Sequence, residues 1–346
     1  MTTESTASQL HNSSLVIDSH NDAIVAYLLR KGESIAGPDA PARSEPESVV
    51  TFLRGSLMPG GREMQVNIPK LRAGGIDVVY CAVDVTRAWG NHLLYAMDAF
   101  GWFLAEVDAH ADQIAIATTA EEIEAIAASG RIAAVLTIEN SEVLERSLWV
   151  LPVLQRLGVR SMTLTWSYRA HAADGAFENV TGGGLTHFGR DLVRSMNELG
   201  MIVDISHISD QGFWDVMDVT NAPIIGSHNA CRALCEHPRN LTDDQIRAVA
   251  DNGGVVGVTY VPAFVDADES KRTLDRLLDH FDHIAQVAGT DCVGLGSDFD
   301  GGGDVLKDAT VVPQITEGLL ARGWQEDDLR KMLGLNHLRV FRQVCG

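Results

Sequence analysis

Short apolar runs rich in β-branched residues recur along the chain, and each ends close to a polar or charged residue. They are apolar without alternation, which is typical of parallel strands that are covered on both faces. Eight such runs occur, at Leu15–Asp18, Ile76–Val83, Ile132–Ile138, Ser161–Thr165, Met201–Ile205, Pro223–Gly226, Gly254–Thr259 and Val293–Gly296.

Helix-like stretches with one apolar face lie between most of these runs. Two of them open with the spacing of a capping box, Thr119 with Glu122 and Thr242 with Gln245. The repeated alternation of strand and helix predicts an α/β fold, a closed (β/α)₈ TIM barrel. The stretches are Leu93–Ala109, Thr119–Ala128, Leu144–Leu157, Thr186–Leu199, Asp210–Val219, Thr242–Asp251 and Leu274–Val287.

A doubly wound open sheet is the alternative architecture. That fold usually carries a glycine-rich phosphate turn after its first strand, and Asp18-Ser19-His20 is not such a turn. The length of 346 residues also suits one barrel with insertions. We therefore expect a single domain over residues 1–346.

Three segments fall outside the alternation. We expect the polar residues 1–14 to form a flexible tail. Residues 31–66 carry proline, glycine and charge without periodicity, so we expect a long insertion after the first strand that serves as a lid or a subunit contact. We expect residues 301–346 to form a C-terminal helical extension that packs beneath or beside the barrel. Its helices include Asp327–Leu333 and Asn336–Val344.

Composition and charge narrow the partners. The chain has 47 acidic and 27 basic residues and a net charge of −20, which repels phosphate backbones and disfavours nucleic acid. The five cysteines are scattered, and Cys231 and Cys235 lack the second pair that a zinc knuckle needs, so free thiols are expected. A homo-oligomer, dimer or higher, is expected.

The chain ends show no targeting pattern. The first 14 residues contain no apolar signal segment, and no apolar run approaches the ~20 residues that span a bilayer. The last residues, FRQVCG, match neither a prenylation motif nor a hydrophobic anchor. These observations predict a cytoplasmic protein without a membrane partner.

Metal-binding side chains follow the predicted strands. Active sites of such barrels lie at the C-terminal ends of the strands. Imidazole and carboxylate groups bind zinc, and a carboxylate can bridge two ions. Taken singly, Glu139 could cap a helix and Asp298 could cap a turn, but their joint placement with the histidines favours a metal site. Six such residues follow five of the runs: His20, Asp22, Glu139, His207, His228 and Asp298.

Several motifs in one order carry a family resemblance. They are VIDSHND at 16–22, NIPKLRAGG at 67–75, MTLT at 162–165, GLGSDFDG at 294–301 and LRVF at 338–341. With these motifs the sequence resembles the membrane dipeptidase (renal dipeptidase) family, within the amidohydrolase-like barrels. The resemblance covers nearly the whole chain and implies a metal-dependent hydrolase of dipeptides, including those that end in a D-residue.

The resemblance also implies the ligand set. One zinc ion would be held by His20, Asp22 and Glu139. A second would be held by Glu139, His207 and His228. Each chain would therefore bind two Zn²⁺ ions with Glu139 bridging, and two such ions lower the pKa of a shared water towards about 7.

Two further residues take roles through the resemblance. Asp298 would accept the proton of the attacking water and pass it to the leaving amine. Arg239 occupies the position of the family's arginine, which binds the terminal carboxylate of the substrate in a bidentate manner. Arg232 lies near His228 in sequence but does not match that arginine.

One position departs from the family. After Leu164-Thr165, well-studied members have a histidine near the scissile bond, and this chain has Trp166. The indole N–H only donates, so it cannot ligate a metal or carry a proton. Either His171 of the same loop reaches the substrate, or zinc alone polarises the carbonyl, or the substrate differs. Trp166 and His171 are therefore the other candidate substrate-binding residues.

Other functions stay open at this point. A related amidohydrolase acting on an N-acyl amino acid or a cyclic amide would use the same ligands. A serine hydrolase is disfavoured because the chain has no Gly-x-Ser-x-Gly motif. A catalytically inactive binding protein is expected to have lost a ligand or Asp298, and all six positions are intact.

Overall fold

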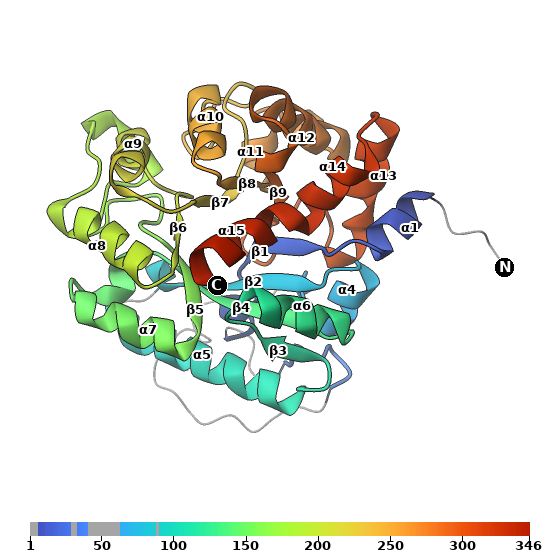
Figure 1. The fold of residues 1–346 in the computed structure, drawn as a ribbon, viewed down its shortest axis with the longest axis horizontal. Coiled ribbons are helices and arrows are strands. Elements are labelled where there is room, and N and C mark those ends of the chain that lie inside the picture. Colours follow the sequence, from blue (N-terminus) through green and yellow to red (C-terminus); the bar gives the residue numbers. More distant parts are fainter. Residues whose placement is uncertain (1–5, 29–32, 41–62, 88–89) are drawn as a thin grey trace.

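The computed structural model describes residues 6–28, 33–40, 63–87 and 90–346. Eight parallel strands pair in chain order, and the last pairs with the first, so the sheet closes. Figure 1 shows helices around these strands, and the predicted TIM barrel is confirmed. The barrel strands are β1 (Ile17–Asn21), β2 (Val78–Asp84), β4 (Ile132–Glu139), β5 (Val159–Thr163), β6 (Ile202–Asp204), β7 (Ile225–Asn229), β8 (Val255–Val258) and β9 (Val293–Leu295).

A ninth strand, β3 (Ile114–Ile116), pairs only with the beginning of β4 and lies outside the closed barrel. The sequence analysis missed it because three residues are too few to register as an apolar run. Strand β1 ends three residues later than predicted. Its polar residues belong to the barrel because Ser19 donates to the Ser227 and Leu295 carbonyls and Asn21 donates to the Tyr80 carbonyl.

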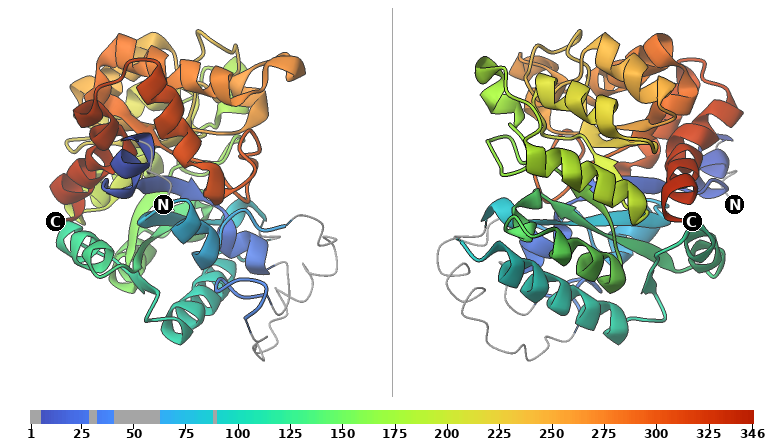
Figure 2. Two further views of the ribbon diagram at one scale, coloured as in Figure 1. Left: turned by 90° about the vertical axis from the view of Figure 1, so that its right-hand side faces the viewer. Right: turned by 60° about the vertical axis from the view of Figure 1, so that its left-hand side comes forward.

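The outer helices surround the barrel (Figure 2), and all but α7 begin and end within one residue of the predicted stretches. The capping box of Thr242 and Gln245 is formed in both directions. At Thr119 only half of it forms, because the Glu122 carboxylate accepts from Thr118 instead. These helices are α5 (His92–Ala109), α6 (Ala120–Ala128), α7 (Leu151–Leu157), α8 (His187–Glu198), α9 (Asp210–Val219), α10 (Asp243–Asp251) and α12 (Leu274–Ala288).

Helix α7 begins seven residues later than the predicted start at Leu144. The preceding Glu145 and Arg146 have φ angles of 44° and 66°. This left-handed conformation breaks a right-handed helix. The pattern of apolar positions could not reveal the break.

The prediction of a flexible tail over residues 1–14 is wrong for helix α1 (Thr6–Asn12). His11 is fully buried: its Nδ1 lies 2.7 Å from Thr316 Oγ1, and its Nε2 lies 2.9 Å from the Gly74 carbonyl oxygen. A polar side chain with two buried partners fixes the segment to the C-terminal extension. Residues 1–5 lie outside the described part.

The C-terminal extension contains α13 (Pro313–Ala321), α14 (Glu326–Arg330), a π-helical turn at Lys331–Leu335 and α15 (Asn336–Cys345). Helix α15 packs beneath the barrel, as predicted. Its Leu338 and Phe341 join an apolar cluster with strand residues such as Ile17 and Val78. Figure 1 shows α15, in red, running across the strands. The opposite end of the barrel is thus left for the site.

Most of the predicted insertion at 31–66 lies outside the described residues, so its role as a lid or subunit contact stays a prediction. Its final residues are tied to the β9 loop. The Asp300 carboxylate accepts from the backbone N–H groups of Gln65 and Val66 at 2.8 and 3.1 Å. The segment therefore ends beside the predicted catalytic Asp298.

Two smaller predictions concern helices and thiols. Of the helices in the described ranges, none has the length and apolar content to span a bilayer. All five cysteines are free thiols. The backbone N–H of Cys231 donates a buried hydrogen bond to His280 Nδ1, which gives the Cys231 position a structural role.

Candidate active site and metal centre

The six predicted residues come together at the C-terminal ends of the barrel strands. His20 and Glu139 lie within β1 and at the end of β4, and His228 lies within β7. His207 follows β6, and Asp298 follows β9. Each of the six is at most 9% exposed.

Glu139 lies between two imidazoles. Its Oε1 is 2.6 Å from His207 Nε2, and its Oε2 is 3.7 Å from His20 Nε2. One oxygen therefore faces each histidine. A carboxylate in this orientation can bridge two cations, as the ligand set requires.

The three imidazoles form one compact group. The Nε2 atoms of His207 and His228 are 2.8 Å apart, and the ring centroids of His20 and His228 are 3.9 Å apart. Three overlapping sets of residues could each hold one metal ion, because the ligand atoms within a set lie within 4.8 Å of one another. The sets are Glu139 with His207 and His228, His20 with Asp22 and Asp298, and His20 with Asp204 and His228.

Two serine hydroxyls orient these rings. Ser167 Oγ lies 2.9 Å from His207 Nδ1, and Ser227 Oγ lies 2.8 Å from His228 Nδ1. Each hydroxyl occupies one ring nitrogen, which leaves Nε2 directed at the centre of the site. Such outer hydrogen bonds are typical of metal-binding histidines.

The electrostatics of the cluster fit a bound divalent cation. Burial, with a smaller contribution from Arg239, lowers the pKa of His20 to about 3, so this imidazole is neutral. Burial raises the pKa of Glu139 well above its ordinary value, and the carboxylates of Asp84, Asp22 and Asp298 raise it further.

A bound cation would offset the repulsion among these carboxylates. Neutral imidazoles and ionised carboxylates are also the states that bind metals. One atom in particular lacks a partner. In the described part of the chain, the buried His20 Nε2 has no hydrogen bond. The residues present therefore fit a metal centre.

Two of the six residues have unusual backbone conformations. His207 and Asp298 have φ angles of 71° and 60°, in the left-handed region that few side chains adopt. Strain of this kind is concentrated at functional sites. Gly301 makes room for the carboxylates, because a Cβ there would lie 1.9 Å from Asp22 Oδ2 and 2.4 Å from Asp298 Oδ1.

Arg239 is a buried cation beside the cluster. It is 2% exposed, and its Nη2 donates weakly to the His228 carbonyl at 3.4 Å. Among the described residues, its Nε has no hydrogen-bond partner. Burial lowers its pKa to about 10, while Asp298 and Glu139 oppose this shift. A guanidinium in this state can accept an anionic ligand.

Arg232, the second arginine of this loop, is already paired. Its guanidinium donates to both oxygens of Asp210 at 2.8 and 2.7 Å. It also donates to the Asn240 carbonyl. The guanidinium of Arg232 is therefore engaged by a carboxylate within the protein, whereas that of Arg239 donates to a carbonyl.

The two candidate substrate-binding residues of the β5 loop differ. Trp166 stacks on His207 with a centroid distance of 5.5 Å and an interplanar angle of 24°. His171 is held by Glu142, whose carboxylate lies 2.9 Å from His171 Nδ1 and accepts from its backbone N–H. Within the described ranges, no contact joins His171 to the metal-binding cluster. The structure thus brings Trp166 to the site and leaves His171 outside it.

Comparison with models of known protein families identifies the family of this chain. Residues 4–345 match the family described as membrane dipeptidase (Peptidase family M19). The chain belongs to the membrane dipeptidase family. The resemblance carried by the sequence motifs is confirmed.

Two relatives within this family illustrate the similarity. Dipeptidase tcpJ of Claviceps purpurea is 35% identical over 242 residues, which make up 69% of this chain and 57% of that protein. Dipeptidase 3 of Mus musculus is 38% identical over 224 residues, 62% of this chain and 45% of that protein. The match thus spans about half the length of these curated relatives.

Two solved structures share the fold over nearly the whole length of this chain. The dipeptidase AC is 26% identical with a TM-score of 0.82, covering 96% of this chain and 99% of that one. A metallo peptidase from Rhodobacter sphaeroides, bound to a phosphinate mimic of the dipeptide L-Ala-D-Ala, is 24% identical with a TM-score of 0.81, covering 96% and 100%. At that identity, the second likeness shows the fold alone.

The sequence analysis missed two carboxylates of the site. Asp84 ends β2 and pairs in register with Glu139. Asp204 ends β6, and its Oδ1 accepts from the backbone N–H groups of Ser206 and Ser227. Both directly follow an apolar valine in a predicted strand, so the signal used for Glu139 and Asp298 could have found them.

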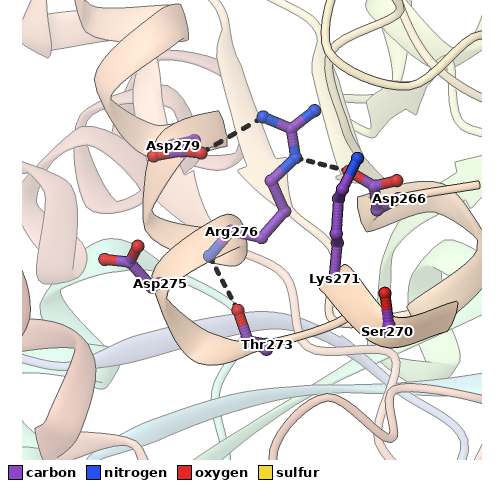
Figure 3. Close-up of a pocket in the computed structure, with 7 residues that line it drawn as sticks. All are labelled: Asp266, Ser270, Lys271, Thr273, Asp275, Arg276 and Asp279. Carbon is purple, nitrogen blue, oxygen red and sulfur yellow. Dashed lines mark hydrogen bonds and ion pairs between the residues drawn. The ribbon is translucent and has the colours of Figure 1, made fainter. Parts of the chain in front are cut away.

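A separate depression of about 450 Å³ lies beside the beginning of α12. It is lined by Asp266, Ser270, Lys271, Thr273, Asp275, Arg276 and Asp279. Figure 3 shows Arg276 between two carboxylates, and it pairs with Asp266 at 2.7 Å and Asp279 at 3.1 Å. Its central cation, Arg276, is already paired within the protein, and we assign this depression no ligand.

Proposed function

We propose that this protein is a binuclear zinc dipeptidase that hydrolyses the peptide bond of dipeptides, including those with a C-terminal D-residue. The observation that carries the proposal is the position of Glu139, with one carboxylate oxygen facing His207 and the other facing His20. The names of the relatives support the substrate class, because both are dipeptidases.

The ligand roles are those that the family resemblance implies. His20, Asp22 and Glu139 would hold one zinc ion. Glu139, His207 and His228, whose donor atoms lie within 4.8 Å of one another, would hold the other. Zinc, when bound, supplies Lewis acidity toward the scissile carbonyl and the attacking water.

Asp298 moves the proton in the proposed reaction. Its carboxylate lies within 4.8 Å of ligand atoms of His20 and Asp22, which supports a role close to the attacking water. A carboxylate oxygen accepts the proton of that water and then donates it to the leaving amine nitrogen. Its backbone is fixed for this role, because the Asp298 N–H donates to the His20 carbonyl at 3.0 Å.

Arg239 selects substrates that end one residue beyond the cut. Its planar guanidinium matches a carboxylate with two parallel hydrogen bonds. Because Arg239 donates to the carbonyl of the ligand His228, the carboxylate is held close to the metal centre. A chain that continues past this residue would lack the carboxylate at this position.

A second candidate is an amidohydrolase of N-acyl amino acids or cyclic amides. The observation in its favour is Trp166, which stacks on His207 at a position where the family has a histidine. An N-acyl amino acid also ends in a carboxylate, so Arg239 would serve both substrates.

A substrate screen distinguishes the two. We expect the zinc-loaded protein to cleave L,L- and L,D-dipeptides with a kcat/KM at least about tenfold higher than for N-acetyl amino acids with the same C-terminal residue, because the dipeptide's amino group is complementary to a carboxylate-rich site. Release of free amino acids measures this, and Glu139→Gln is the inactive control. The reverse preference would assign the protein to the N-acyl substrates.

A further inference from the structure

We propose that the side chain of the substrate's C-terminal residue packs against an aromatic arc, and that the enzyme therefore prefers a large apolar or aromatic residue at that position. The arc consists of Trp166, Tyr168, Phe177, His237 and Phe264. This inference rests on the proposed function, since it concerns the residue whose carboxylate Arg239 binds.

The rings of the arc contact one another in sequence. The centroid distances are 5.7 Å from Trp166 to Tyr168, 5.4 Å from Tyr168 to Phe177 and 6.5 Å from Trp166 to Phe177. Phe177 lies 6.4 Å from the His237 ring, which lies 4.5 Å from Phe264. Three loops, after β5, β7 and β8, thus supply one continuous aromatic surface.

This surface joins the two ends of the proposed substrate site. At one end Trp166 stacks on the metal ligand His207. At the other end the Arg239 guanidinium lies over the Phe264 ring, 5.4 Å from its centroid. The arc therefore borders the space between the metal-binding cluster and the carboxylate-binding arginine.

The chemistry of a dipeptide places one side chain in that space. The scissile amide nitrogen is bonded to the α-carbon of the C-terminal residue, which also carries the terminal carboxylate. With the scissile carbonyl at the metal centre and the carboxylate at Arg239, this α-carbon lies between them. Its side chain therefore faces whatever lines the gap, which here is the arc.

The arc is held rigidly to the metal ligands. The backbone N–H of Ala176 donates to the His207 carbonyl at 2.7 Å, and that of Phe177 donates to the Ser167 carbonyl at 2.8 Å. Gly175 allows this close packing, since a Cβ there would lie 2.3 Å from the Trp166 carbonyl oxygen. A preformed surface costs little to order when a ligand binds.

The arc is apolar, and part of it is exposed. Tyr168 and Phe177 are 57% and 41% exposed. Burial and the neighbouring Arg239 and Arg232 lower the pKa of His237 to about 4, so its ring is uncharged at neutral pH. Covering these rings with an apolar side chain is favourable, whereas a charged side chain would lose hydration without gaining a partner.

The test compares dipeptides that differ only at the C-terminal residue. For the zinc-loaded protein we expect kcat/KM to rise from Ala-Gly through Ala-Leu to Ala-Phe, by about tenfold or more overall. The reason is that removing an aromatic side chain from water is favourable by a free energy of at least this size. Ala-Asp should be no better than Ala-Gly. Trp166→Ala and Phe177→Ala should each reduce the Phe-to-Gly ratio by at least about threefold.

A matched control is Trp214→Ala. Trp214 is a partly exposed tryptophan on α9 whose ring contacts Phe213. Its replacement by alanine should leave the Phe-to-Gly ratio unchanged. Because Phe177 is exposed, its removal tests the arc without disturbing the core. The alternative occupant of the arc is another copy of this chain, and size-exclusion chromatography of each variant detects it. If the variants change the oligomeric state and leave the ratio intact, the arc is a subunit contact and the inference is overturned.

The outcomes separate the inference from the proposed function. Cleavage of Ala-Gly and Ala-Phe with equal kcat/KM upholds the dipeptidase and overturns the arc. If dipeptides resist cleavage and N-acetyl amino acids are hydrolysed, the ratio of N-acetyl-Phe to N-acetyl-Gly tests the arc in the same way. If neither class is hydrolysed, calorimetric titration with phosphinate mimics of Ala-Phe and Ala-Gly decides, and equal affinities contradict the inference.

Discussion

Replacing Asp298 with asparagine should lower kcat by about 10²–10⁴-fold and leave the zinc content unchanged. General acid–base catalysis contributes about this factor, and asparagine keeps the shape of the side chain but cannot carry the proton. The carboxylate is buried beside Asp22 and His20, so its loss removes the proton carrier from the centre of the site. Steady-state kinetics with one dipeptide, together with elemental analysis, measures both quantities.

Asp304→Asn is the matched control for this variant. Asp304 lies in the same glycine-rich loop and is exposed, so its replacement should change neither kcat nor zinc content. Loss of zinc in Asp298→Asn would show that this carboxylate is a metal ligand, and the proposed separation of ligands from proton carrier would then be wrong.

Removal of the Arg239 side chain should weaken only the recognition of the terminal carboxylate. A charge-assisted hydrogen bond is worth about 1.5–3 kcal/mol, and a bidentate pair somewhat more. Arg239→Ala should therefore lower kcat/KM for a dipeptide by roughly ten- to a few hundred-fold. The dipeptide amide, which has no carboxylate, should be a poor substrate of the unaltered protein and should hardly change.

Arg232→Ala provides the comparison within the same loop. Arg232 is engaged by Asp210, so its removal should affect the acid and the amide equally, through the loop alone. If Arg239→Ala also produced equal losses on both substrates, Arg239 would support the loop and would not bind the carboxylate.

Much of the fold could be predicted because burial on both faces requires continuous apolar runs. The limits of prediction lie where tertiary contacts decide. The helix that contains His11 is held in place because the His11 ring nitrogens contact Thr316 and the Gly74 carbonyl, which are far away in sequence. The late start of α7 depends on left-handed residues at 145–146, which periodicity does not encode.

The site was predictable for a different reason. Parallel strands of a barrel end at one rim, so polar residues that follow apolar runs must converge there. The conformation of the loops cannot be predicted in this way, which is why His171 was a candidate in the sequence and pairs with Glu142 in the structure. The aromatic arc was also hidden, because Trp166, His237 and Phe264 lie in three separate loops.

The central claim is a metal centre of two zinc ions bridged by Glu139. Titration of zinc into chelator-treated protein, with bound metal and dipeptide hydrolysis followed together, tests it most directly. We expect hydrolysis to reach its maximum at about two zinc ions per chain, and Glu139→Gln to lose tight binding of both. Maximal hydrolysis at one ion or fewer, or two ions bound equally well by Glu139→Gln, would contradict the account.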